Sequence, residues 1–382
     1  MNRSVLFDAR LILPWPTGIG QYNTSLLPEM IAQAPDIHFH VLRRPDTWPD
    51  YGIETWQAPN LTLHMSRLPH MSWRQQLAVP RFAKLVSADL IHYPHFDAPV
   101  LSERVPVVAT VHDAKYLVRP DFITHLNVVK RMYMRLAFRA TLKRASAVLF
   151  ISRATAADMQ RLFSMAAGQG KVVHLAADPR FRPATAEDVA LVKRRYKIHR
   201  PFILTVGERR PHKNHVGLID AYARSDSRTT HDLVIVGQAY SDYVEPENCI
   251  RSLGLEDAVH FVTTATFEDL VGLYTAADIF VLVSLYEGFG LPILEAMACG
   301  TPVIASSTTA TGEIAGPHSL QVDPTDTNEI AAALDRLADD EALRRQLAGQ
   351  AAGWAASFDW KRTAKETLEV YRRLMAIRGI EG

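Results

Sequence analysis

Two glutamates flank a short glycine-rich loop, and this segment has the clearest chemical character in the chain. It runs Glu287-Gly-Phe-Gly-Leu-Pro-Ile-Leu-Glu295, so that Gly288 and Gly290 lie between the two carboxylates. Glycine lets a backbone approach a ligand closely, and carboxylates accept hydrogen bonds from hydroxyl groups. This combination favours a ligand with phosphate and many hydroxyls, such as a sugar nucleotide. An ordinary turn with two solvated glutamates is the alternative.

The residues around this loop predict the elements that hold it. Residues 279–283 form an apolar run typical of a buried strand, and Pro292 suits the first turn of a following helix. Gly300 suits the left-handed position after a helix. The loop of such a βα unit lies at the carboxyl edge of a parallel sheet, where open α/β folds bind ligands. Backbone N–H groups at the start of the helix attract phosphate there.

A second predicted strand, residues 202–206, leads into a loop dense in cations. Gly207 is followed by Arg209, Arg210 and Lys213. Cations in a partly desolvated site can neutralise a diphosphate, and the guanidinium fork of arginine matches phosphate oxygens. The position at a strand end favours a functional role, with a solvated run of charge as the alternative.

The composition excludes several classes of protein. The 382 residues exceed the size at which a single core usually stops growing, about 250–300 residues, so we expect two domains. The formal charge of +1 argues against a dedicated nucleic-acid binder. Two cysteines are too few for a disulfide framework, and the apolar runs are too short for a secretory leader or a membrane span. We expect a cytoplasmic protein with no nucleic-acid partner.

Short apolar runs alternate with longer amphipathic segments, which is typical of an α/β fold with mostly parallel sheets. Two series of strands predict two Rossmann-like domains that face a cleft. We place the first domain at residues 1–182, the second at 198–360 and a terminal helix at 361–382. The predicted strands are residues 4–8, 38–42, 90–93, 107–111 and 147–151, then 202–206, 233–236, 260–262, 279–283 and 302–305; the predicted helices include 22–33 and 126–144.

The order of motifs along the chain resembles family 4 of the retaining glycosyltransferases, which have the GT-B fold. Segment 287–295 is similar to the family's two glutamates with seven residues between them. The resemblance covers most of the chain and implies a last helix that crosses back to the first domain. Its other motifs are Phe7-Asp-Ala-Arg10, Thr17-Gly-Ile-Gly-Gln-Tyr22, Val111-His-Asp113, Gly207 to Asn214, Pro302-Val-Ile-Ala305, Asp323-Pro324 and Phe358-Asp-Trp360.

The resemblance implies a role for each residue of the glutamate loop. By position, Glu295 binds the ribose of the donor nucleotide, and Glu287 faces the donor sugar as a catalytic residue. Backbone groups of the residues between them meet the sugar and the phosphates: Gly288, Phe289, Gly290 and Leu291.

The cationic loop matches the family less completely. Lys213 fits the lysine at the donor diphosphate, and Gly207 fits the glycine at the end of the strand. The arginine position of the family falls on Glu208, and Arg209 stands one residue later. Either Arg209 or Glu208 therefore takes that place.

Three residues of the first domain complete the implied site. Gly18 and Gly20 resemble a glycine loop near the donor phosphate and the acceptor, and His112 resembles the histidine that contacts the donor sugar. A structural role is the alternative for a single histidine. We expect Asp113 to steady the loop of His112.

The chemistry implied by the resemblance is front-face attack with retention of configuration. The leaving diphosphate accepts the proton of the acceptor, and Arg209 and Lys213 stabilise its charge. No catalytic metal and no cofactor are implied. The histidine pairs with three-residue spacing lack further ligands for zinc and fit core or loop roles better: His92/His95 and His212/His215.

We therefore expect a hexosyltransferase that moves mannose from GDP-mannose to a glycan or lipid-linked acceptor in surface polysaccharide or lipopolysaccharide assembly. The choice of mannose rests on the likeness of segments 17–20 and 287–290 to such transferases. A UDP- or dTDP-sugar donor is the nearest alternative. A same-fold epimerase or phosphorylase and a non-catalytic glycan-binding protein are others. An NAD-dependent oxidoreductase would need a third glycine near Asn23.

Positive charge is concentrated in one part of the chain. Residues 61–150 hold 13 Lys or Arg against 5 Asp or Glu. Residues 130–144 place cations at helical spacing among apolar side chains, which is typical of a helix at a membrane surface. This indicates peripheral contact with anionic lipids on the inner face of the cytoplasmic membrane, with a solvated helix face as the alternative. Further residues with the same character are Trp73, Arg74, Arg81 and Lys84.

Overall fold

The computed structural model describes residues 3–102, 105–122, 128–165 and 170–381. The chain divides into two units, each built on its own sheet. Unit 1 holds residues 1–175 and 359–382, and unit 2 holds residues 176–358. The last helix is thus part of unit 1, although the whole of unit 2 precedes it in the sequence.

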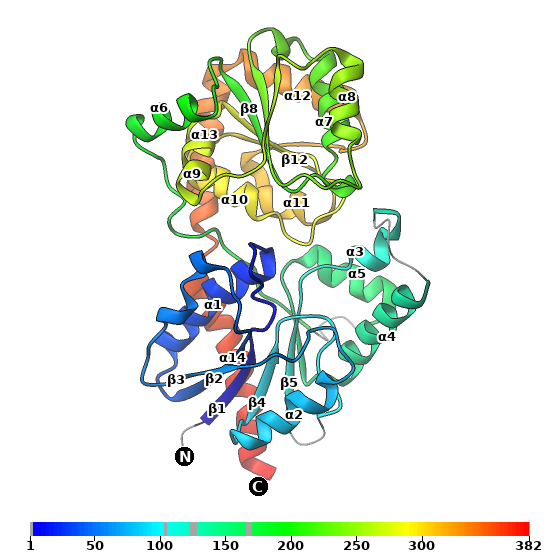
Figure 1. Cartoon of the computed structure of the whole chain (residues 1–382), viewed down its shortest axis with the longest axis vertical. Coiled ribbons are helices and arrows are strands. Elements are labelled where there is room, and N and C mark those ends of the chain that lie inside the picture. Colours follow the sequence, from blue (N-terminus) through cyan, green and yellow to red (C-terminus); the bar gives the residue numbers. More distant parts are fainter. Residues whose placement is uncertain (1–2, 103–104, 123–127, 166–169, 382) are drawn as a thin grey trace. The chain divides into compact units, whose positions relative to one another are not determined.

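Unit 1 contains a sheet of seven parallel strands in the order β3-β2-β1-β4-β5-β6-β7 (Figure 1). The chain starts in the middle of the sheet, moves to one edge and then continues on the other side of β1. The strands are β1 (Arg3–Asp8), β2 (Ile37–Arg43), β3 (Leu61–Met65), β4 (Leu90–Tyr93), β5 (Val107–Val111), β6 (Ala147–Phe150) and β7 (Lys171–Val172).

Helices cover both faces of this sheet. Because the chain steps along the sheet in opposite directions, right-handed crossovers place α1 on one face and α2 and α4 on the other. Ile91 and Tyr93 of β4 join the core under α2, whereas His92 between them contacts Tyr371 of α14, which packs against α1. The helices are α1 (Gly18–Gln33), α2 (Gln75–Leu85), α3 (Lys115–Val118), α4 (Val128–Arg144), α5 (Arg153–Phe163) and α14 (Trp360–Glu381).

Unit 2 contains six parallel strands in the order β10-β9-β8-β11-β12-β13. The strands are β8 (Phe202–Val206), β9 (Asp232–Val236), β10 (Val259–Val262), β11 (Ile279–Leu282), β12 (Val303–Ser306) and β13 (Leu320–Val322). The helices are α6 (Ala186–Arg195), α7 (His215–Arg224), α8 (Glu245–Leu253), α9 (Phe267–Ala276), α10 (Leu291–Ala298), α11 (Thr309–Ala315), α12 (Thr327–Asp339) and α13 (Glu341–Ala356). Both units are therefore Rossmann-like, and the α/β prediction is confirmed.

All ten predicted strands form, with ends within one residue of the prediction. The sequence does not predict β3, β7 and β13, which lie at the edges of the two sheets. An edge strand has a neighbour on one side only, and these three bury few of their side chains. They therefore lack the continuous apolar run that identifies the central strands.

Helices occupy two stretches that the sequence analysis did not assign to helix. Helix α1 starts at Gly18 rather than at residue 22, because Thr17 caps it by accepting a hydrogen bond from the Gly20 N–H at 2.9 Å. Helix α6 lies in the stretch between the two predicted domains. Its last residue, Arg195, pairs with Asp269 of α9, which places α6 in unit 2.

The predicted helix 126–144 corresponds to α4, which is described from Val128; residues 126 and 127 lie outside the described residues. Only Met134, Phe138, Thr141 and Leu142 of α4 are buried. No helix within the described ranges has both the length and the apolar character needed to cross a bilayer.

Candidate active site

The glutamate loop and the cationic loop leave the sheet of unit 2 side by side. Strands β8 and β11, which precede these loops, are parallel neighbours at the centre of the sheet. The strand order reverses between them, and open α/β sheets bind ligands at the carboxyl edge of such a reversal. The order of strands in the sheet thus brings together two loops that follow separate strands in the sequence.

Lys213 and Glu287 form the polar centre of this site. Lys213 Nζ lies 2.6 Å from Glu287 Oε1, and Ser284 Oγ donates to the same oxygen at 2.8 Å. Both charged side chains are largely buried. Burial disfavours the charged form of Lys213, but Glu287, Glu208 and Glu295 outweigh burial and raise the pKa of the lysine. Lys213 is therefore a fixed cation at the sheet edge, where it can meet phosphate.

Two neighbours hold the lysine in place. Asn214 adopts a left-handed backbone, and its side-chain amide donates to the carbonyl oxygens of Val283 at 3.1 Å and Pro324 at 2.7 Å. A Cβ atom at Gly207 would lie 3.3 Å from the Cδ and Cε atoms of Lys213, so glycine leaves room for the lysine stem. Gly207, one of the predicted site residues, thus affects the site by the position that it allows the Lys213 side chain to take.

The glutamate loop enters a helix as predicted. Gly290 has a φ of 107°, which a side chain would strain, and Pro292 occupies the first turn of α10. The buried side chain of Phe289 anchors the loop. The positive end of the α10 dipole is thereby directed at the segment between Glu287 and Leu291.

Glu295 lies on α10 and is held by a residue that the sequence analysis did not select. Tyr274 of α9 is fully buried, and its hydroxyl donates to Glu295 Oε2 at 2.8 Å. Burial raises the pKa of Glu295 to about 7, Asp178 acts in the same direction, and Tyr274 and Lys213 oppose them in part. Glu295 therefore changes charge near neutral pH.

This pKa predicts that nucleotide binding depends on pH. Ribose hydroxyls donate more strongly to a carboxylate than to a carboxylic acid, so the ribose contact that the resemblance implies favours charged Glu295. We expect the nucleotide affinity of the wild type to rise about tenfold from about pH 6 to about pH 8. Calorimetric titration across that range measures the affinity. The Glu295→Gln variant should lack this rise, and an identical pH profile in both proteins would contradict the assignment.

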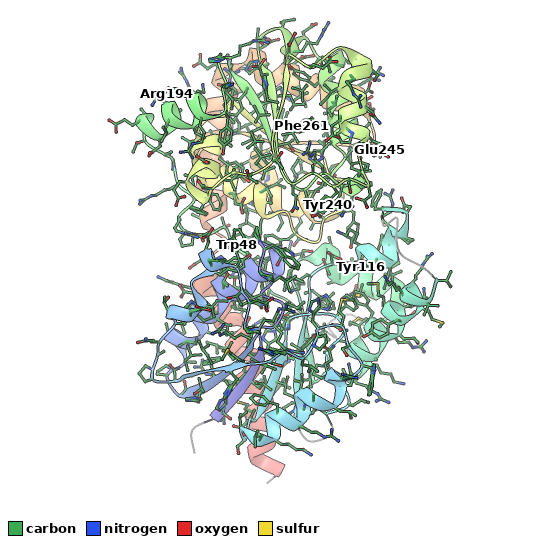
Figure 2. All side chains as sticks on the ribbon, in the orientation of Figure 1. Trp48, Tyr116, Arg194, Tyr240, Glu245 and Phe261 are labelled. Carbon is green, nitrogen blue, oxygen red and sulfur yellow. The ribbon has the colours of Figure 1, made fainter. Side chains whose placement is uncertain are left out.

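The two arginines of the cationic loop have partners within unit 2. Arg209 Nη1 lies 2.7 Å from Glu247 Oε1 of α8, and its guanidinium lies 4.3 Å from the ring centroid of Phe261. Arg210 pairs with Asp242 and lies 3.5 Å from the ring centroid of Tyr240. Figure 2 labels both rings, Phe261 and Tyr240. Among the three predicted cations, Lys213 alone pairs with the glutamate loop in the described structure, whereas Arg209 pairs with Glu247 and Arg210 with Asp242.

Glu208 also has a structural partner. Its Oε2 accepts a hydrogen bond from the Tyr240 hydroxyl at 2.9 Å, and its Oε1 lies 3.9 Å from His212 Nε2. The carboxylate stays near enough to Lys213 to help raise the lysine pKa. Glu208 thus contributes negative charge at the position where the resemblance implies an arginine.

In unit 1, both predicted glycines lie in the first turn of α1. A Cβ atom at Gly20 would lie 2.6 Å from the Tyr51 hydroxyl oxygen, whereas a Cβ at Gly18 would meet nothing within 4 Å. Gly20 is therefore required for packing, and Gly18 leaves the helix start open. The predicted glycine loop thus takes the form of a helix N-terminus capped by Thr17.

His112 follows β5 and is held on two sides. Its Nε2 donates to the Pro94 carbonyl oxygen at 3.1 Å, which leaves Nδ1 as the acceptor nitrogen, and its ring meets the Tyr22 ring edge-on with centroids 4.8 Å apart. Burial and nearby His95 lower the pKa of His112 to about 3, so the ring is neutral. Asp113 Oδ1 accepts from the Lys115 N–H at 3.0 Å and steadies the loop, as predicted.

A buried chain of hydrogen bonds leads from Tyr371 of α14 to Tyr22, whose ring packs against His112. Tyr371 of α14 bonds to His92 Nδ1, and His92 Nε2 lies 2.8 Å from the Thr110 hydroxyl. That hydroxyl lies 3.0 Å from the hydroxyl of Tyr22. All four side chains are buried and cannot reach water, so these hydrogen bonds satisfy polar atoms that would otherwise lack a partner. His92 therefore has the core role that the sequence predicted.

We expect the Tyr371→Phe variant to test this chain. The substitution keeps the ring but leaves His92 Nδ1 buried without its partner, which costs about 1–3 kcal/mol. The free energy of unfolding from urea titration should fall by that amount. The matched variant Tyr133→Phe, which removes the hydroxyl of an exposed tyrosine, should unfold like the wild type. A Tyr371→Phe protein as stable as the wild type would show that the bond contributes nothing.

Three residues of the site were not predicted as site residues, namely Tyr274, Ser284 and Asn214, although Asn214 ends the motif that begins at Gly207. Ser284 and Asn214 lie close in sequence to predicted site residues, and this proximity could have identified them. Tyr274 has no such neighbour and looks like any other apolar residue of a helix. Among the described residues, no group of three or more His, Cys, Asp or Glu side chains is arranged to hold a metal ion.

Comparison with known proteins covers nearly the whole chain. The family described as "Glycosyltransferase Family 4" matches residues 16–181, and the family described as "Glycosyl transferases group 1" matches residues 192–354. The chain is 29% identical over 374 residues to the O-antigen chain mannosyltransferase B of Escherichia coli, covering 94% of this chain and 96% of the relative.

Two further proteins are similar. The MMP alpha-(1->4)-mannosyltransferase of Mycolicibacterium hassiacum is 31% identical over 286 residues, covering 71% of this chain and 66% of the relative. The crystal structure of Anabaena HepE in complex with UDP and glucose has a TM-score of 0.76 and 22% identity, and the match covers 97% of this chain and 100% of that one. The matched families, the relatives and the two Rossmann-like units together show that this chain belongs to glycosyltransferase family 4 and is a hexosyltransferase of the GT-B fold.

Proposed function

We propose that this enzyme transfers mannose from GDP-mannose, with retention of configuration, to a glycan or lipid-linked oligosaccharide in surface polysaccharide biosynthesis. The arrangement of Lys213, Glu287 and Glu295 around one sheet edge carries the proposal, because it joins a cation for a diphosphate to carboxylates for hydroxyls. The names of two relatives, an O-antigen chain mannosyltransferase and an alpha-(1->4)-mannosyltransferase, support mannose as the sugar.

Each residue has a proposed role in binding the donor. Glu295, oriented by Tyr274, accepts hydrogen bonds from the ribose, and Glu287 accepts from hydroxyls of the sugar. Lys213 contacts the diphosphate. Backbone groups at the start of α10 complete the contacts with sugar and phosphate. The remaining proposed donor contacts are Gly18, Gly20, Gly207 and Arg209, with His112 at the sugar.

The proposed reaction needs no base from the protein. The acceptor hydroxyl oxygen forms a bond to the anomeric carbon while the bond from that carbon to the diphosphate oxygen breaks on the same face. The leaving diphosphate takes the hydroxyl proton. Lys213 stabilises the negative charge that develops on the diphosphate, and the fixed site supplies orientation. We propose no cofactor and no catalytic metal for this reaction.

A UDP-sugar is the second candidate donor. HepE, which has the same fold, was solved with UDP and glucose, and its structure supports a nucleoside diphosphate as the ligand of such a site. A dTDP-sugar is a further alternative. The donors share the diphosphate and the sugar hydroxyls, so the residues above would bind all of them in the same way.

A calorimetric panel tests the proposal. Wild-type protein and the Glu295→Ala variant are titrated with GDP, UDP, ADP, dTDP and NAD. Selective binding of GDP, weakened in the variant, is the expected result. Selective binding of another nucleoside diphosphate would replace the proposed donor, and binding of NAD alone would overturn the proposed chemistry.

We also propose that the protein works in the cytoplasm, in peripheral contact with an anionic membrane surface. The excess of Lys and Arg over residues 61–150, which belong to unit 1, supports this contact. A lipid-linked acceptor would be presented at such a surface.

A further inference from the structure

Unit 1 exposes apolar side chains on two helices in particular. Of the fourteen large hydrophobic side chains that are exposed in the described structure, eight lie on α2, α4 or the residue pair before α2. Scattered exposed apolar residues are ordinary, but a concentration of this kind marks an interaction surface. The eight are Trp73, Leu77, Leu85, Val128, Val129, Met132, Tyr133 and Leu136.

The two helices lie on the same face of the sheet and are tied to one short segment. Gln75 of α2 donates to the backbone and carboxylate oxygens of Asp97 at 2.9 and 2.7 Å. Thr141 of α4 donates to the Phe96 carbonyl oxygen at 2.6 Å and accepts from the Ala98 N–H at 3.2 Å. Because both helices turn their buried sides to this segment and the sheet, their exposed sides point away from it together.

On α4 the exposed residues form two neighbouring rows. Val128, Met132 and Leu136 follow one another at four-residue spacing and make an apolar row. Three cations at the same spacing run beside it, namely Arg135, Arg139 and Lys143. An apolar row flanked by a basic row is the arrangement of a helix that lies in a membrane interface.

Helix α2 has the same combination of exposed apolar and basic side chains. Trp73 at its start is 70% exposed and Leu85 at its end is 79% exposed, with Arg81 and Lys84 exposed between them. Tryptophan is favoured at the level of lipid headgroups. Neither residues 73–85 nor residues 128–144 contain Asp or Glu, so nothing on the two helices opposes an anionic surface.

The cations are available for an external partner. Among the described residues, Arg81, Arg135 and Arg139 form no ion pair with an acidic side chain. Arg135 and Arg139 also line a hollow of about 280 Å³ together with Leu162, Phe163 and Ser164 of the α5 end. Two guanidinium groups beside apolar side chains suit a phosphate that is attached to lipid.

We propose that the exposed side of α2 and α4 is a docking face for an anionic bilayer, with Arg135 and Arg139 binding a phospholipid phosphate. We call it the α2–α4 face. The proposal rests on the proposed membrane contact and identifies the surface that makes it. Trp73, Met132 and Leu136 enter the interface, and the basic row meets the headgroups.

Co-sedimentation with lipid vesicles tests the face on the full-length protein. The vesicles contain phosphatidylcholine alone or phosphatidylcholine mixed with phosphatidylglycerol. Wild-type protein should pellet with the anionic vesicles and stay in solution with the neutral ones, and high salt should release it. The Arg135→Ala/Arg139→Ala variant should bind anionic vesicles about thirtyfold more weakly, because two cations near the surface are lost.

Apolar variants and a matched control separate insertion from charge. Met132→Asp/Leu136→Asp should weaken vesicle binding about tenfold or more. Leu191→Asp changes an exposed leucine on α6 of unit 2 and should bind vesicles like the wild type. Inorganic phosphate as a competitor distinguishes a lipid phosphate from a free one, since it should not displace protein that is also held by apolar contacts.

Three results would overturn the proposal. These are no binding of the wild type to anionic vesicles, equal binding by the wild type and both surface variants, or self-association of the wild type that the same variants abolish. Nucleotide titration of the surface variants keeps the tests separate. Their nucleotide affinity should equal that of the wild type, so a failure of the donor proposal leaves the lipid result readable, and the reverse also holds.

Discussion

A Lys213→Ala variant should lose about 10²–10³-fold in kcat, because one fixed donor to the leaving group is removed. The lysine is the cation that the structure places against the glutamate loop, 2.6 Å from Glu287. In the proposed reaction its charge stabilises the diphosphate as the bond to the sugar breaks. The loss should appear in steady-state rates of donor hydrolysis or transfer at saturating donor.

Nucleotide binding distinguishes this role from a structural one. Lys213→Ala should bind the nucleoside diphosphate more weakly and the nucleoside as tightly as wild type does, because only the diphosphate meets the lysine. Arg224→Ala is the matched control. Arg224 is an exposed cation on α7, which begins just after Lys213, and it pairs with Asp220. Equal losses for the diphosphate and the nucleoside would show that the substitution had disturbed the pocket as a whole.

Substitutions of the two glutamates should affect different measurements, one nucleotide affinity and the other turnover. Glu295→Ala removes the proposed charged acceptor for the ribose, a hydrogen bond of about 1.5–3 kcal/mol, and should weaken nucleotide binding by about 10–10²-fold. Glu287→Ala should leave nucleotide affinity nearly intact and lower kcat by about 10²-fold, because the sugar loses its partner while the nucleotide keeps its own.

Calorimetry with the nucleoside diphosphate and kinetics with the sugar nucleotide measure the two effects. The substitutions Glu287→Gln and Glu295→Gln keep the shape of each side chain and remove the charge. They should reproduce the split, with smaller losses, if the carboxylates act through hydrogen bonds. Parallel losses of affinity and turnover in both alanine variants would contradict the division of roles.

Prediction from sequence worked best where the signal is local. The central strands are short apolar runs with helices between them, and ten of the thirteen strands follow from that pattern. The loop at Gly290 and the helix that starts near Pro292 also follow, since a positive φ and a missing N–H each need a particular residue type. Three of the four edge strands, β3, β7 and β13, were missed because an edge strand has a single neighbour and these three bury few of their side chains.

The sequence predicted less well which partner each charged side chain pairs with. Arg209 and Lys213 are cations of the same loop and were both expected at the diphosphate, yet Arg209 pairs with Glu247 whereas Lys213 pairs with Glu287. The partners lie far along the chain, on other elements of the same unit. Spacing within one loop carries no information about which distant carboxylate the sheet order brings near.

The sequence alone determined the two loops of unit 2 and the pair of glutamates, because these depend on residue type and spacing within a short segment. It also determined the fold class, through the alternation of apolar and amphipathic segments, and the order of its motifs carried the resemblance to the family. The tertiary structure decided that Lys213 meets Glu287, that Tyr274 holds Glu295 and that the apolar sides of α2 and α4 face the same way. Those facts depend on strand order and helix packing. Distances between segments arise only when the chain is folded, and pKa shifts and exposed surfaces follow from those distances.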